Sequence, residues 1–70
     1  MKHGARNDIP ATVSKIKKGG VMCQIEVTLE GTDYTMSSVM TLDSLDTLGL
    51  KIGDRVHVVA KAVNVLLMKP

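Results

Sequence analysis

The chain has 70 residues, of which 44% are hydrophobic, and its formal net charge is only +2. This length predicts a single domain over residues 1–70, and the weak charge gives no argument for a nucleic-acid partner. Cys23 is the only cysteine, which excludes an internal disulfide, and together with His3 and His57 it cannot supply the four ligands of a structural zinc site. A domain of this size buries only about 60% of the surface of its unfolded chain. Because the composition is apolar for so small a domain, we expect self-association.

Cysteine usage and hydropathy also predict the location of the protein. One unpaired cysteine fits a reducing compartment. Residues 1–10 are polar and lack the apolar segment of a signal peptide. No run approaches the roughly 18 apolar residues of a membrane span. We therefore expect a cytoplasmic protein with no membrane partner.

Short runs rich in β-branched residues alternate with glycines, which is the pattern of a small all-β domain. The first predicted strand covers residues 11–17, and Gly19-Gly20 forms the turn after it. The second strand covers residues 21–30 and is the clearest, because apolar and polar side chains alternate along it and give it one apolar face. A weaker third strand follows over residues 34–40.

The period then changes, because leucines recur every three residues between Thr41 and Leu50. This spacing predicts a short helix that is capped by Thr41 and ends at Gly49. Its leucines are expected to plug the open end of a barrel. The fourth and fifth predicted strands, residues 55–61 and 63–68, carry apolar side chains on both faces. Strands of this kind are buried on both sides, so in a chain with one helix the second cover must come from another subunit.

The order of the elements is three strands, one short helix and two strands. This order matches the five-stranded OB-type barrel. The predicted fold is therefore an all-β, OB-type five-stranded barrel with one short helix, assembled as an oligomer.

Nothing in the chain indicates catalysis. Cys23 lies on the apolar face of the second strand and is expected to be a buried, inert thiol. His57 points outward on the fourth strand, with no acidic partner that the sequence predicts. The carboxylates are scattered, and neither a phosphate-binding loop nor a dinucleotide fingerprint is present. We expect neither an enzyme nor an organic cofactor, and no set of direct metal ligands.

An OB-type barrel also raises the possibility of nucleic-acid binding, which relies on aromatic stacking along a basic groove. The chain has one aromatic residue, Tyr34, and no phenylalanine or tryptophan. Its main basic cluster, Lys15, Lys17 and Lys18, borders a glycine turn and fits a solvated loop end. The composition therefore disfavours a nucleic-acid partner.

Positive and hydroxyl side chains gather instead at predicted strand ends and at the helix start. The segment Gly4-Ala5-Arg6-Asn7 places a permanently charged guanidinium beside an amide and a glycine. Thr41 and Ser44 adjoin the free N–H groups of a helix start, which favour anions, and Lys61 ends the fourth strand. Each has a simpler explanation, a solvated arm for the first segment and a lysine that reaches the surface for Lys61. Together they are the components of an anion site.

These segments resemble the molbindins, which are single Mop domains related to the TOBE domains of transporter ATPases and molybdate-responsive regulators. Gly4-Ala5-Arg6-Asn7 is similar to the Ser-Ala-Arg-Asn opening of that family, and Lys17-Lys18-Gly19 to its glycine turn. The segment 41–50, followed by Gly53-Asp54, resembles its helix and turn, and 59–65 resembles its closing strand pair. Four such motifs, in order and at the right spacing, cover essentially the whole chain.

The resemblance implies a homohexamer, a trimer of dimers, that binds molybdate or tungstate between subunits and stores or buffers the oxyanion in the cytoplasm. Carried over by position, it implies that Arg6 and Lys61 supply positive charge. The implied oxyanion-binding set is Arg6, Lys61, Asn7, Thr41, Ser44, Ala62, Ala5 and Gly4. A second site near the threefold axis is implied at Gly19, Gly20 and Val21. The family usually has serine where this chain has Gly4, which raises the question of how the ligand is held there.

Two other functions are carried alongside this one. The first is an oxyanion-sensing regulatory module of the same fold, in which anion binding alters a partner; the lack of a fused domain in the chain argues against it. The second is an OB-type nucleic-acid binder, against which the missing aromatic residues argue.

Overall fold

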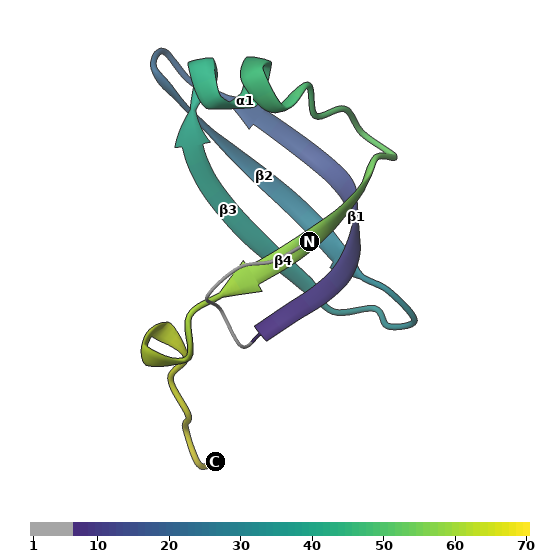
Figure 1. Cartoon of the computed structure of the whole chain (residues 1–70), viewed down its shortest axis with the longest axis vertical. Helices are drawn as coiled ribbons and strands as arrows, with labels where there is room; N and C mark the ends of the chain where they lie inside the picture. Colours follow the sequence, from purple (N-terminus) through teal and green to yellow (C-terminus); the bar gives the residue numbers. More distant parts are fainter. Residues whose placement is uncertain (1–6) are drawn as a thin grey trace.

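The computed structural model describes residues 7–70, and within them the chain forms one four-stranded antiparallel sheet, one α-helix and one 3-10 helix (Figure 1). The elements are β1 (Asn7–Lys18), β2 (Met22–Leu29), β3 (Thr35–Thr41), α1 (Leu42–Leu48), β4 (Arg55–Ala60) and η1 (Ala62–Asn64). The strand order is β3-β2-β1-β4, so β3 and β4 are the edge strands. The three strands and the helix that the sequence predicts up to residue 50 are all present.

A bulge in β1 helps to curl this sheet into a half-barrel. Val13 pairs with Val27 whereas Lys15 pairs with Glu26, so Ser14 is the extra residue in β1. The Ser14 hydroxyl donates to the backbone carbonyl of Glu26 at 3.1 Å. Bulges bend the strand and increase its twist. Accordingly, β4 crosses over the sheet at a steep angle to β2 in Figure 1.

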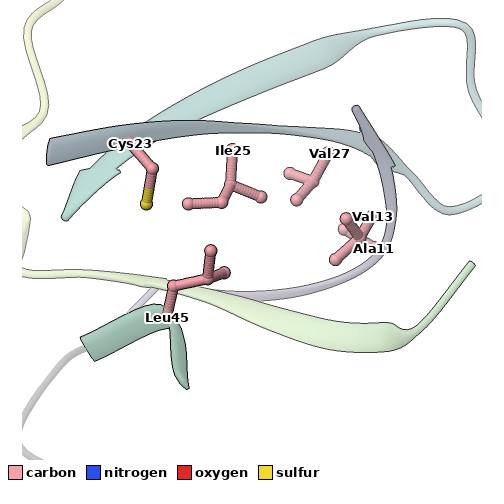
Figure 2. Packing of buried hydrophobic residues seen from close by; sticks show 6 residues of the cluster. All are labelled: Ala11, Val13, Cys23, Ile25, Val27 and Leu45. Atoms are coloured by element: carbon pink, nitrogen blue, oxygen red, sulfur yellow. The ribbon is translucent and has the colours of Figure 1, made fainter. Parts of the chain in front are cut away.

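The hydrophobic core lies inside this curl (Figure 2). It is formed by Ala11, Val13, Cys23, Ile25, Val27 and Leu45. The three core residues of β2 are two positions apart, as the alternation in the sequence predicts. Among the helix leucines, Leu45 is buried and Leu42 packs partly against the core, whereas Leu48 is 62% exposed. Only two of the three helix leucines therefore pack against the core, whereas the sequence predicts that all three close the end of the barrel.

Helix α1 begins and ends where the sequence predicts. The Thr41 side chain accepts a hydrogen bond from the Ser44 backbone N–H at 3.1 Å, which caps the first turn. Gly49 ends the helix in the left-handed conformation, with φ of 66°, and its N–H donates to the Leu45 carbonyl at 3.0 Å. A side chain at Gly49 would be strained at this φ.

The predicted fifth strand is not formed, and this corrects the five-stranded barrel. Residues 62–64 form η1, and the segment after it runs away from the sheet (Figure 1). Its side chains have no cover: Val63, Leu66, Leu67 and Met68 are 84–94% exposed. The physical reason is that no strand within residues 7–70 pairs with this segment, and an unpaired strand leaves its backbone groups to water.

Strand β4 also departs from the expected burial on both faces. Val56 and Val58 are half-buried on the inner face, whereas Val59 on the other face is 42% exposed. A second subunit that covers this face stays a prediction. Neither helix in residues 7–70 has the length and hydrophobicity needed to span a bilayer.

Candidate functional site

One group of predicted site residues lies where β1 begins and β4 ends. Asn7 is opposite Ala60 in the antiparallel register, and the Asn7 side-chain amide donates to the Ala60 carbonyl at 3.3 Å. This pairing brings the start of β1 close to Lys61 and Ala62, which follow β4 directly and are exposed. We call Asn7, Lys61 and Ala62 the strand-end group. Strand pairing therefore joins residues from the two ends of the sequence.

Three other predicted residues, Gly4, Ala5 and Arg6, lie outside the described residues. They precede Asn7 directly in the sequence. Their contribution to the site stays a prediction.

A second group lies at the start of α1. The Thr41 hydroxyl donates to the Ser44 hydroxyl at 3.0 Å and accepts from the Ser44 backbone N–H. Since each hydroxyl carries one proton, the proton of the Ser44 hydroxyl is left over to donate outward. Both side chains are exposed. The helix start therefore presents a hydroxyl donor at the surface.

The predicted second site adjoins this same helix start. The Leu42 backbone N–H donates to the Val21 carbonyl at 2.9 Å, which fixes the loop between β1 and β2 against α1. A shallow hollow of about 230 Å³ lies there, lined by Gly20, Val21, Thr41, Leu42 and Asp43. We call Gly20, Val21, Thr41 and Ser44 the helix-start group. The carboxylate of Asp43 beside it works against an anion.

Gly19 has a structural role in the turn between β1 and β2. Its N–H donates to the Met22 carbonyl at 2.8 Å. A Cβ on Gly19 would come within 3.1 Å of that carbonyl oxygen, which is tighter than most real contacts. The turn therefore favours glycine at this position for packing reasons alone.

The two groups lie at opposite ends of the sheet. The strand-end group is at the first residue of β1, whereas the helix-start group adjoins the turn that follows its last residue, Lys18. In Figure 1, α1 is at the top of the molecule and β4 ends in the lower half. One copy of the chain therefore does not bring the predicted oxyanion ligands together.

The structure also shows a close polar contact that the sequence did not predict. His57 Nδ1 lies 2.7 Å from Asp8 Oδ1, across the β1–β4 pairing. No acidic partner for His57 was predictable from the sequence, and the structure identifies Asp8 as that partner. The two residues are 49 positions apart in the chain, so only the register of β1 against β4 could have revealed the pair.

Metal coordination is not supported within residues 7–70, because no cluster of three or more histidine, cysteine, aspartate or glutamate side chains occurs there. Cys23 is 3% exposed, and its thiol donates to the Met40 carbonyl at 3.4 Å. The expectation of a buried thiol is confirmed.

Comparison with known proteins now places the chain in a family. The sequence profile of the TOBE domain family matches residues 4–67. The chain belongs to this family. The resemblance seen in the four sequence motifs is thereby confirmed, and the match includes the N-terminal segment from Gly4 onward.

Relatives of this TOBE domain are described as molybdenum-pterin-binding or molybdate-binding proteins. Molybdenum-pterin-binding protein 3 of Clostridium pasteurianum is 32% identical over 68 residues, which are 97% of this chain and 98% of the relative. The structure of a molybdate-binding protein from Sporomusa ovata superposes with a TM-score of 0.88 and 38% identity, over 99% of this chain and 100% of that one.

A longer relative has the same fold. The cytoplasmic molybdate-binding protein ModG, in a form with molybdate bound, superposes with a TM-score of 0.81 and 39% identity. The match covers 89% of this chain and 43% of the ModG chain. At these levels of identity, the TOBE domain described here shares the fold of solved molybdate-binding proteins.

Proposed function

We propose that this TOBE domain binds molybdate or tungstate in the cytoplasm and stores or buffers the oxyanion, with the binding sites between subunits of a homohexamer built as a trimer of dimers. The observation that carries the proposal is the division of the predicted ligands into a strand-end group and a helix-start group. Each group has a donor at the surface, and neither is a complete site in one copy. The names of the relatives support molybdate as the ligand.

The chemistry of the proposed ligands suits a tetrahedral dianion. Arg6 and Lys61 supply two positive charges, and Asn7, Thr41 and Ser44 supply neutral donors. Hydrogen bonds to charged groups contribute about 1.5–3 kcal/mol each. A micromolar dissociation constant corresponds to about −8 kcal/mol. Two cations and several neutral donors therefore suffice for micromolar binding, after the cost of removing water from the anion.

The proposed site is completed by association. In one copy the helix-start group is at the far end of β1 from the strand-end group, so an anion that contacts both must lie between two copies. Both groups are exposed and accessible to a neighbouring subunit. The backbone near Ala62 and Ala5 adds N–H donors to the same set, and at Gly4 a backbone N–H or a water replaces the serine hydroxyl usual in the family.

A second oxyanion site is proposed at the turn formed by Gly19, Gly20 and Val21. The hollow beside Gly20 and Val21 is open to solvent, and its backbone is held against α1. The nearby carboxylate of Asp43 predicts that this site is the weaker of the two.

The proposal describes a binding protein without enzymatic activity or an organic cofactor. Tyr34, directly before β3, is the single aromatic side chain, and one aromatic residue does not make the row of stacking platforms of a nucleic-acid groove. A regulatory module that passes anion binding to a partner is the alternative of the same fold.

Titration calorimetry with molybdate, tungstate and sulfate tests this function directly. We expect heat with molybdate and tungstate at a ratio of one anion or fewer per subunit, and poor competition by excess sulfate, because sulfate has the same charge and shape but is smaller. No heat with either larger anion at tens of micromolar protein would contradict the proposal.

Two substitutions test the assignment of the ligands. Arg6→Ala and Lys61→Ala should each weaken binding by about tenfold to a hundredfold, the loss of one charged hydrogen bond. Both variants should keep the oligomer in sedimentation experiments. Lys15→Ala, which removes an exposed lysine from the middle of β1, is the matched control and should keep full affinity. Unchanged affinity in both test variants would show that the site lies elsewhere.

A further inference from the structure

The outer face of the β1–β4 pairing carries a polar contact that the proposed anion site does not use. Pro10 is opposite His57 in the antiparallel register, so Asp8, two residues before it, is a diagonal neighbour of His57 on the same face. Asp8 Oδ1 lies 2.7 Å from His57 Nδ1, within the range of hydrogen bonds between charged groups. The contact therefore holds the Asp8 carboxylate against the imidazole.

Asp8 is also a neighbour of the strand-end group. It follows Asn7 directly, and it is opposite Val59, two positions before Lys61. Lys61 has an extended backbone, with φ of −68° and ψ of 141°, so the alternation of β4 continues to it and directs its side chain to the outer face. Asp8 is therefore the diagonal neighbour of His57 on one side and of Lys61 on the other.

A carboxylate at this position works against an anion site. A dianion held by Asn7 and Lys61 lies near the negative charge of Asp8, and exposed charges act on one another over a Debye length of about 8 Å at physiological salt. The carboxylate also attracts the Lys61 ammonium, which the anion needs as its own partner. A group that neutralises Asp8 and holds it in place reduces both effects.

His57 is such a group only in its protonated form. An imidazolium cancels the charge of Asp8, whereas a neutral imidazole leaves a full negative charge on the pair. A histidine side chain ordinarily changes its charge between about pH 5 and pH 8. The side chains of His57 and Asp8 are 54% and 33% exposed, so both exchange protons with solvent.

The other charged groups that face His57 belong to residue types that keep their charge over this pH range. Within residues 7–70 they are Arg55 on the same strand, Glu30 after β2, and Lys61. Arg55 Nη2 lies 2.7 Å from Glu30 Oε1, so these two charges cancel. Apart from Asp8, the outward residues of β1 nearest to His57 carry no titratable group. Near neutral pH, the charge on this face therefore changes through His57.

We propose that His57 is a positioning residue for the anion site: in its protonated form it holds and neutralises the Asp8 carboxylate, so the affinity for the oxyanion falls as the pH rises. This inference rests on the proposed binding of an oxyanion at the strand-end group. The sign follows from charge, because protonation adds a positive charge near a site for a dianion. By linkage, the bound anion favours protonation of His57 to the same extent.

Titration calorimetry with molybdate at about pH 6 and pH 8 tests this role. The wild-type dissociation constant should be about twofold to fivefold larger at the higher pH, the effect of one screened charge near the site. His57→Gln keeps a neutral hydrogen-bond donor but cannot be protonated, so it should bind weakly at both pH values. His57→Lys carries a permanent positive charge and should bind tightly at both.

Two further variants identify the groups involved. His3→Gln is the matched control, because His3 is the only other histidine of the chain, and it should keep the full pH dependence. Asp8→Asn removes the repelling carboxylate and should bind about twofold to fivefold more tightly than the wild type at the higher pH. Sedimentation should give the same size for every variant as for the wild type.

Proton uptake is a readout that a merely structural role of His57 would not change. Binding heats in two buffers of different ionisation enthalpy give the number of protons taken up with each anion. The wild type and His3→Gln should take up part of a proton near neutral pH, and His57→Gln should lose most of that uptake.

The outcomes separate this role from the binding function itself. Equal wild-type affinity at the two pH values, a pH dependence that persists in His57→Gln, or weaker binding by Asp8→Asn would overturn the role of His57 and leave the binding function intact. No binding of molybdate by the wild type at either pH would overturn the function and this role together.

Discussion

Two regions of this small protein use apolar residues in different ways. From β1 to α1, residues 7–48, apolar side chains alternate with polar ones and the chain buries them itself; all six core residues come from here. From β4 onward, residues 55–70, apolar side chains occupy both faces, and the structure leaves many of them exposed. A one-sided pattern specifies a fold within one chain. A two-sided pattern at the edge of a sheet is the basis of the proposed association between copies.

The largest effect on stability is expected from the loss of a core side chain within residues 7–48. Ile25 is 1% exposed, and Ile25→Ala should lower the free energy of unfolding by about 2–5 kcal/mol, because it leaves a cavity in the core. Denaturant titration measures the loss. A loss below about 1 kcal/mol would mean that residues 7–48 do not form the stable part of the molecule.

A smaller effect is expected where β3 passes into the helix. Thr41→Ala removes the side-chain acceptor for the Ser44 N–H and should cost about 1 kcal/mol of stability. Ser37→Ala is the matched control, because Ser37 is an exposed hydroxyl of β3 that accepts a hydrogen bond from the Gln24 side chain at 3.3 Å and caps no helix. Equal losses in the two variants would show that the cap does not stabilise the helix start.

The ion pair between Arg55 and Glu30 joins the two regions across the surface. Its atoms are 2.7 Å apart, but the two side chains are 73% and 50% exposed. Exposed pairs of this kind are worth roughly 0–1 kcal/mol and are screened by salt. Glu30→Gln should therefore lower stability by less than about 1 kcal/mol, and the difference should shrink in 1 M salt. A difference that grows with salt would contradict this assignment.

The smallest effect is expected in the C-terminal segment of a single copy. Leu66 is 92% exposed, so Leu66→Ala should change unfolding by no more than about 0.5 kcal/mol under conditions where sedimentation finds single chains. At concentrations where copies associate, the same substitution should become destabilising. Denaturation at several protein concentrations separates the two cases. A loss that does not depend on concentration would remove the contrast between the regions.

Local patterns in the sequence predicted the elements that depend on neighbours along the chain. The alternation of residues 21–30 predicted which side chains of β2 are buried, and Thr41 and Gly49 predicted both ends of α1. These features depend on the side-chain period and on capping, which act over a few residues.

Features that depend on distant pairing were not predictable. The contact between Asp8 and His57 follows from the register of β1 with β4. The separation of Thr41 from Lys61 follows from that register together with the pairings of β1 with β2 and of β2 with β3. The fifth strand was predicted from the apolar composition of residues 63–68, but a strand also needs an edge to pair with. Composition alone does not say which chain supplies that edge. The place of Arg6 in the site also stays a prediction.

The pairing of β1 with β4 has a consequence for how the molecule folds. Strands β1, β2 and β3 follow one another through short turns, whereas β4 must find the start of β1 from about fifty positions away. Closing so long a loop costs entropy before any contact repays it, so we expect this pairing to form last. Asn7 and Lys61 are brought together only by that step. An anion bound there would stabilise the pairing of β1 with β4 once it has formed, and would slow the first step of unfolding.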